Sequence, residues 1–252
     1  INEAAILSAR KKKKMIGMFE LEEAIDRVLA GPAKKSRIIS DKEKKILAYH
    51  ELGHAVAGLV LPNAFPVHKV TIIPRGTSTL GFTESLPLED RYLITKSELL
   101  DNMAQALGGR AAEDLVFGEI TTGASSDLER ASAMARSMVT QFGMSERLGP
   151  IAWGKEEEEV FLGRELTRMK NYSEEIASEI DAEVKKIVLT SYEKAKRVLS
   201  DQRKKLDEAA EFLLQKETIT GRELADILGL DSGNFYKDDF EEVDIATGPK
   251  TE

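Results

Sequence analysis

The sequence of 252 residues contains no cysteine. Both a disulfide framework and a thiolate metal site are therefore excluded, and the composition is compatible with a reducing compartment. No segment approaches the roughly 20 consecutive apolar residues that a membrane-spanning helix needs. The chain begins Ile1-Asn2-Glu3, without an initiator methionine or a signal-peptide pattern, so we expect it to be a soluble piece of a longer protein.

An excess of positive charge is also missing, because 36 lysines and arginines face 44 acidic residues and the net charge is -8. Binding to nucleic acid normally draws on a basic surface, so this charge argues against a nucleic-acid partner and favours a protein or peptide partner. Hydrophobic residues make up 42% of the chain and charged residues 32%, which is typical of a globular, helix-rich protein.

The hydrophobic pattern predicts a mainly α fold with a small β-sheet, an α+β class. Helices are predicted over residues 2–13, 20–30, 46–61, 96–116, 126–142, 172–200 and 202–215, with a short one starting near 220. Strands are predicted at 67–73 and 80–83. The segment 46–61 is apolar nearly all round and too short to cross a bilayer, so we expect it to be a buried helix.

Three side chains within this apolar segment can take part in metal or acid–base chemistry, namely His50, Glu51 and His54. A spacing of four residues places both imidazoles on one face of a helix, one turn apart, where both can bind one tetrahedral ion. Glu51 lies about 100° round the helix from His50, so it can reach the ion's water without binding the ion. The pattern predicts a zinc-dependent hydrolase, in which zinc activates the water and polarises the carbonyl while Glu51 moves the proton.

Three alternatives compete with this interpretation. His50 and His54 could be core histidines with ordinary hydrogen-bonding partners, although burying this polar trio costs several kcal/mol unless a cation compensates. The chain could instead be a non-catalytic helical oligomerisation scaffold with a structural metal site. Because a structural site needs only ligands, Glu51 distinguishes the two. A zinc amidase acting on small molecules is a weaker alternative.

The third zinc ligand is left open by spacing alone. The candidates are Glu113, Asp114, Glu119, Asp127 and, less readily, the strand residue His68. An extended metzincin motif is excluded, because Ala57 and Val60 stand where that motif has glycine and histidine.

Asp127 also has a purely structural explanation. Ser126 and Glu129 have the spacing of a capping box, which would place Asp127 in the first turn of a helix, where any carboxylate is favourable. Glycines near the motif suggest close packing: Gly53 suggests that a backbone or the substrate passes nearby, and Gly108-Gly109 suggests a close helix crossing or a functional role.

Several stretches together resemble one family, the FtsH family of membrane-anchored, ATP-dependent AAA zinc metalloproteases. They are residues 2–5, 23–28, 30–32, 50–54, 68–76, 108–113 and 121–130. The resemblance covers nearly all of residues 1–230 and concerns the C-terminal part of the family. Leu52 departs from it, since alanine is usual at that variable position of the motif.

The resemblance implies that Asp127 is the third zinc ligand beside His50 and His54, with Glu113 as the second choice and Glu51 as the catalytic base. It implies residues 1–34 as the C-terminal end of an AAA ATPase lid and 35–231 as a helical zinc peptidase domain, whereas the scarcity of apolar residues and the acidic run predict 232–252 as a flexible acidic tail. It further implies a homo-hexamer that degrades unfolded membrane and short-lived cytosolic proteins at the cytoplasmic face of the bacterial inner membrane, or in the corresponding organelle.

ATP and Mg²⁺ would belong only to a missing ATPase domain, and membrane attachment only to a missing N-terminal anchor. No Gly-x-x-x-x-Gly-Lys phosphate loop occurs in the chain, so ATP hydrolysis cannot be assigned to it. Residues 80–83 would lie near the metal and could offer a strand edge to an extended peptide substrate.

Overall fold

The computed structural model describes residues 1–33, 40–75, 80–85, 93–154 and 172–231. The predicted acidic tail, residues 232–252, lies outside the described residues. The α-helices of the described part are α1 (Asn2–Arg10), α2 (Met18–Leu29), α3 (Asp41–Val60), α4 (Lys96–Ala106), α5 (Gly108–Phe117), α6 (Ser125–Thr140), α7 (Glu174–Asp201), α8 (Arg203–Lys216) and α9 (Gly221–Leu228). A short 3₁₀ helix, η1 (Thr122–Ala124), precedes α6.

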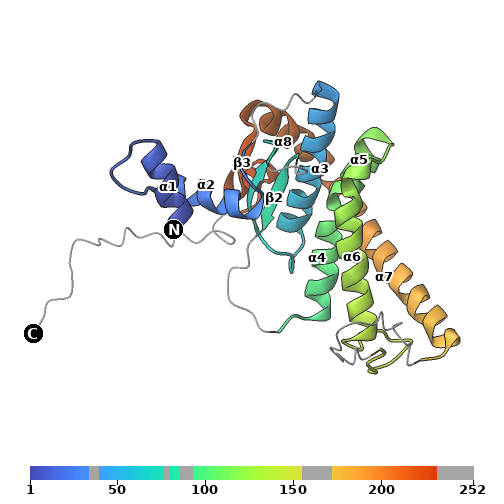
Figure 1. The fold of residues 1–252 in the computed structure, drawn as a ribbon. Coiled ribbons are helices and arrows are strands. Elements are labelled where there is room, and N and C mark those ends of the chain that lie inside the picture. The colour runs from blue at the N-terminus through green and yellow to red at the C-terminus, as the bar shows by residue number, and fades with distance from the viewer. Residues whose placement is uncertain (34–39, 76–79, 86–92, 155–171, 232–252) are drawn as a thin grey trace, which may run out of the picture.

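Helix α3 forms the centre of the molecule (Figure 1) and contacts α4, α5, α7, α8 and the sheet. Its N-terminus is closed by a capping box, in which Ser40 accepts a hydrogen bond from the Glu43 backbone and the Glu43 carboxylate accepts from the Ser40 N–H. Every residue from Ala48 to Leu59 is buried. The predicted buried helix is therefore confirmed, and it begins earlier than its apolar segment because the capping box adds a polar first turn.

One predicted helix, residues 96–116, is wrong as a single element. The structure divides it into α4 and α5 at Leu107, directly before Gly108 and Gly109. Two consecutive glycines weaken a helix, because each is less favourable there than alanine by about 1 kcal/mol. After the break, the start of α5 lies directly against α3, with Gly108 beside Gly53.

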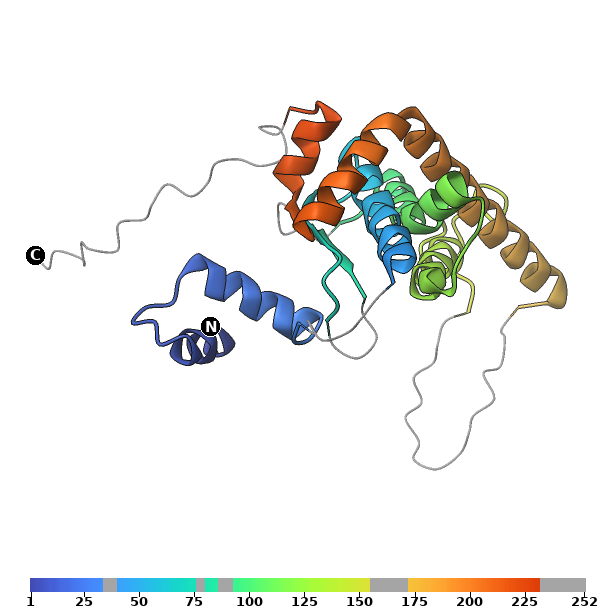
Figure 2. The same ribbon diagram turned by 90° about the horizontal axis from the view of Figure 1, so that it is seen from above.

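The sheet of the described residues has three antiparallel strands, β1 (Val67–Thr71), β2 (Phe82–Ser85) and β3 (Thr218–Thr220). Their order is β2-β1-β3, so β1 is central and β2 forms an edge. The predicted α+β class is confirmed, and the late strand β3 is the element that the hydrophobic pattern did not single out. In Figure 2 the sheet lies between α2 and the helices around α3.

Helices α1 and α2 stand at one end of the molecule (Figures 1 and 2). Ion pairs join α2 to the sheet region: Arg75 binds Asp26 and Glu23 at 2.9 Å each, and Lys69 of β1 binds Asp26 at 2.6 Å. Arg75 and Asp26 are both buried, with 5% of each residue exposed. Helix α2 is therefore joined to the sheet region by these charge pairs. Among the described residues, no helix is both long and apolar enough to cross a membrane.

Candidate metal centre

The motif on α3 faces a neighbouring helix at very short range. A Cβ atom added to Gly53 would lie 2.3 Å from the backbone oxygen of Gly108, and one added to Gly108 would lie 2.3 Å from the oxygen of Gly53. No other residue type fits at such a contact. Of the two sequence interpretations of Gly53, the close backbone approach is confirmed. This crossing brings the start of α5 beside His50 and His54.

Asp127 reaches the same place from α6. The predicted capping box is wrong, because α6 already begins at Ser125, its N-cap position is Ala124, and no side chain caps it. The reason is that η1 leads directly into α6, so Ser126 is inside the helix. Asp127 still lies in the first turn, which favours a carboxylate through the helix dipole.

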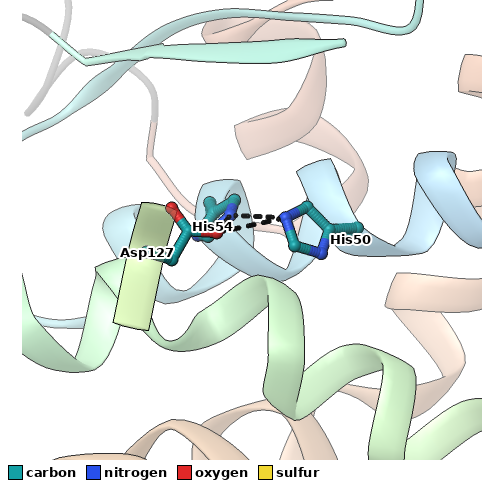
Figure 3. A group of neighbouring side chains, drawn as sticks. All are labelled: His50, His54 and Asp127. Atoms are coloured by element: carbon teal, nitrogen blue, oxygen red, sulfur yellow. Dashed lines mark hydrogen bonds and ion pairs between the residues drawn. The ribbon is translucent and has the colours of Figure 1, made fainter. Parts of the chain in front are cut away.

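His50, His54 and Asp127 form the group of potential metal-binding side chains among the described residues. The two Nε2 atoms are 3.2 Å apart, and Asp127 Oδ2 lies 3.3 Å from that of His50 and 3.4 Å from that of His54. Figure 3 shows the rings from α3 and the carboxylate from α6 turned toward one another. Ligands at about 2.0–2.1 Å from a tetrahedral zinc are separated by about 3.3 Å, so these atoms fit the ion.

The outer nitrogens of both rings have acceptors that fix the rings. His50 Nδ1 lies 2.6 Å from Glu113 Oε1, and His54 Nδ1 lies 2.9 Å from the backbone oxygen of Gln105. A carbonyl oxygen only accepts, so His54 Nδ1 carries the proton and Nε2 keeps its lone pair for a metal. The Gly109 N–H also points at His54 Nδ1, from the longer distance of 3.3 Å, but a protonated Nδ1 cannot accept it, so the shorter contact with Gln105 decides the tautomer. Such outer partners orient metal-binding histidines.

Glu113 connects His50 on α3 to Thr121 in the loop that leads to Asp127. Besides His50, its carboxylate accepts hydrogen bonds from Thr121, at 2.7 Å from the backbone N–H and 3.2 Å from the hydroxyl. Burial alone raises the pKa of Glu113, but the hydrogen bonds from His50 and Thr121 outweigh it and the pKa is lowered. A buried anion therefore links α3 to the loop that leads to Asp127.

The charges of the group fit a cation. Burial alone lowers the pKa of His50, but the carboxylates of Asp127 and Glu113 outweigh it and raise the pKa to about 10. Burial likewise opposes ionisation of Asp127, yet hydrogen bonds from His50 and His54 hold its pKa below the usual range. The cluster thus stabilises positive charge where the three ligand atoms converge.

Glu51 points from α3 toward the edge strand. Oγ1 of Thr83 lies 2.9 Å from both the backbone oxygen and Oε2 of Glu51. Burial raises the pKa of Glu51, although His54, His50 and Thr83 partly offset that effect. A carboxyl with a raised pKa is suited to accept and return a proton near neutral pH.

The other third-ligand candidates lie elsewhere. Glu113 contacts Nδ1 of His50, whereas the Nε2 atom that faces Asp127 is on the other side of the ring. Asp114 accepts hydrogen bonds from Tyr192 and Lys196, both at 2.9 Å. Glu119 and His68 are exposed. Asp127 is therefore the candidate that the fold brings to both Nε2 atoms.

Gly109 has a role that spacing did not reveal. A Cβ atom at this position would lie 2.6 Å from His50 Cε1, 2.6 Å from His54 Nε2 and 2.7 Å from His50 Nε2. Glycine therefore leaves open the space that the two rings use. The Gly108-Gly109 pair was the sequence feature that pointed here, and the structure supports both roles offered for it. Gly108 lies at the close crossing of α5 and α3, and Gly109 leaves room for the two histidine rings.

The metal group opens into a cleft of about 950 Å³. The larger apolar side chains on its wall come from α3, from the loop before β1 and from the segment around β2; they are Ile46, Leu47, Phe65, Leu80 and Phe82. The edge strand β2 thus borders the cleft beside Glu51. An extended peptide can pair with such an edge through its backbone.

Comparison with known proteins gives one family and a set of close relatives. The model of peptidase family M41 matches residues 37–227. The chain is 73% identical over 244 residues to a protein of Kosmotoga olearia named ATP-dependent zinc metalloprotease FtsH, covering 96% of this chain and 38% of that protein. It is 60% identical over 228 residues to the protein of that name in Thermotoga maritima, covering 90% of this chain and 37% of the relative.

A protein of Thermoanaerobacter sp. named ATP-dependent zinc metalloprotease FtsH 1 is 52% identical over 246 residues, which are 98% of this chain and 39% of the relative. The chain therefore spans less than two fifths of the length of these curated relatives.

Proposed function

Because the chain belongs to peptidase family M41, we propose that it carries a zinc-dependent endopeptidase site in which His50, His54 and Asp127 hold the ion and Glu51 is the general base. The observation that carries this proposal is the convergence of three ligand atoms at mutual distances of 3.2, 3.3 and 3.4 Å. Nitrogen and carboxylate ligands in a group of three, with a position left for water, are typical of catalytic zinc.

When bound, zinc acts as a Lewis acid that lowers the pKa of a water to about 7 and polarises the peptide carbonyl. Glu51 takes the proton of the attacking water on its carboxylate and delivers it to the leaving amine nitrogen. Glu113 and the Gln105 backbone oxygen hold the Nδ1 protons of the two histidines, so that both Nε2 atoms face inward. The β2 edge aligns the peptide backbone beside Glu51.

At the level of the whole protein, the proposal is an ATP-dependent protease that degrades unfolded membrane and short-lived cytosolic proteins. The names of the relatives support the ATP dependence. Residues 1–34 are then the end of the AAA ATPase lid, 35–231 the peptidase domain and 232–252 an acidic tail. The proposal also includes assembly into a homo-hexamer. A membrane anchor outside this chain would hold the protein at the cytoplasmic face of the bacterial inner membrane, and an ATPase domain outside this chain would bind ATP and Mg²⁺.

The test separates catalysis from metal binding. Glu51→Gln keeps the size of the side chain and removes the base, so we expect zinc to stay bound while cleavage of an unfolded, fluorescently labelled protein falls below detection. His54→Ala should lose both zinc and cleavage. If Glu51→Gln cleaved at the wild-type rate, the catalytic role would be wrong. If zinc bound to wild type and no condition gave cleavage, the scaffold with a structural metal site would be favoured.

A further inference from the structure

The edge strand β2 presents two different faces. Successive side chains of a strand point to opposite sides. Glu84 lies 3.5 Å from Lys69, and the ring centroid of Phe82 lies 5.7 Å from the Lys69 ammonium and 5.9 Å from the Arg75 guanidinium, so both side chains point to the side that meets α2, although Phe82 also borders the cleft. Thr83, between them, points to α3 and contacts Glu51. The strand thus separates the buried charge pairs of α2 from the metal centre.

Thr83 and Gly81 together surround the Glu51 side chain. The Thr83 hydroxyl has one proton to donate, and both acceptors within 2.9 Å belong to Glu51. Gly81 borders the same side chain, because a Cβ atom there would lie 3.1 Å from Glu51 Oε1 and 3.2 Å from its Cγ. Thr83 therefore contacts one oxygen of the carboxylate, and Gly81, just before β2, borders the other.

We propose that Thr83 is a positioning residue that holds the Glu51 carboxylate in the orientation in which it accepts the proton. The inference rests on the proposed function of Glu51. A glutamate side chain facing a cleft has several rotamers, and fixing one carries an entropic cost of up to about 2 kcal/mol. A hydrogen bond to an ionised group is strong enough to offset that cost. Because β2 is also the edge that would receive the peptide, one strand would fix both the orientation of the Glu51 carboxylate and the position of the peptide bond to be cleaved.

Loss of a hydrogen bond to a charged group costs enough to lower a rate by about 10- to 100-fold. Thr83→Val removes the donor and keeps the shape of the side chain, and valine is favourable in a strand. We therefore expect kcat for an unfolded protein to fall by about 10- to 100-fold with KM changed less than about threefold. Thr83→Ser restores the donor and should recover most of kcat.

A second readout does not depend on turnover. A peptide hydroxamate binds zinc through its two oxygens and offers an acidic proton to a neighbouring carboxylate. Calorimetric titration of the zinc-loaded chain should show weaker hydroxamate binding by about tenfold in Thr83→Val and binding within about threefold of wild type in Thr83→Ser. Zinc content should stay at the wild-type value in both variants, because Thr83 contacts none of the three ligands in the structure.

Thr71→Val is the matched control, since Thr71 is a buried sheet threonine whose hydroxyl contacts Glu217 and Thr218 of the β3 side instead of Glu51. It should keep wild-type kcat and hydroxamate affinity. Thr83→Ala is a second variant without the hydroxyl, should Thr83→Val fail to fold. Wild-type hydroxamate affinity and kcat in the hydroxyl-free variant would overturn the inference, and so would loss of zinc. Glu51→Gln measured alongside tells the failures apart, because only the proposed function predicts that it is inactive.

Discussion

Gly109→Ala should weaken zinc binding while leaving the fold intact. The added Cβ atom would lie 2.6 Å from His50 Cε1 and from His54 Nε2, where ordinary contacts are 3.4–4 Å. The rings must therefore shift by about 0.8 Å or more, and each shift changes the separation of the ligand atoms. Overpacking of this kind costs about 1–3 kcal/mol. We expect the zinc dissociation constant to rise by about 10- to 100-fold.

Without metal, the same substitution should be tolerated. The atoms that the Cβ meets belong to side chains, which can rotate when they need not converge on an ion, and alanine is a better helix former than glycine by up to about 1 kcal/mol. The free energy of unfolding of the metal-free chain should therefore stay within about 1 kcal/mol of wild type. Competition titration with a chromophoric chelator measures the zinc affinity, and urea unfolding monitored by circular dichroism measures the stability.

Gly53→Ala is the contrasting variant. Its Cβ atom would meet the backbone of Gly108 at 2.3 Å, so α3 and α5 must move apart and stability should fall even without metal. If Gly109→Ala bound zinc as tightly as wild type, the reasoning about the space beside the rings would be refuted. The same follows if Gly109→Ala and Gly53→Ala lost equal stability without metal.

Three further predictions concern the surroundings of the site. Glu113→Gln should lower zinc affinity by about 10- to 100-fold, because a charged partner of a ligand ring becomes neutral; chelator competition measures this, and unchanged affinity would contradict it. Arg75→Met leaves the buried carboxylate of Asp26 with fewer partners and should destabilise the chain by about 3 kcal/mol in urea unfolding. Removing the exposed Arg136 in the same way should cost less than about 1 kcal/mol, so equal losses would refute the importance of the buried pairs. Gly81→Pro should slow cleavage of an unfolded protein by disturbing the β2 edge, and an unchanged rate would exclude peptide pairing there.

The sequence predicted what depends on local spacing. His50, Glu51 and His54 lie on one buried helix, and four-residue spacing is sufficient to foresee that both imidazoles share a face. A close neighbour of α3 was also foreseeable from Gly53, because a glycine inside an apolar helix indicates close packing, but spacing did not identify that neighbour as α5. What spacing alone could not select was Asp127, since its position depends on how α6 packs against α4 and α7.

The missed features have the same tertiary origin. The break at Leu107 follows from two glycines that pack against α3, whereas the periodicity of the segment continues through them. The capping box at Ser126 was a valid local pattern, but η1 starts the helix earlier. The link from His50 through Glu113 to Thr121 joins three elements, so no local pattern indicates it.

The measurement that tests the central claim most directly is the zinc content of the purified chain after repletion, compared with that of His54→Ala and Asp127→Ala. We expect about one zinc per wild-type chain and a clear loss in both variants, because each removes one of three ligands. No zinc in the wild type, or full zinc content in Asp127→Ala, would contradict the proposed centre.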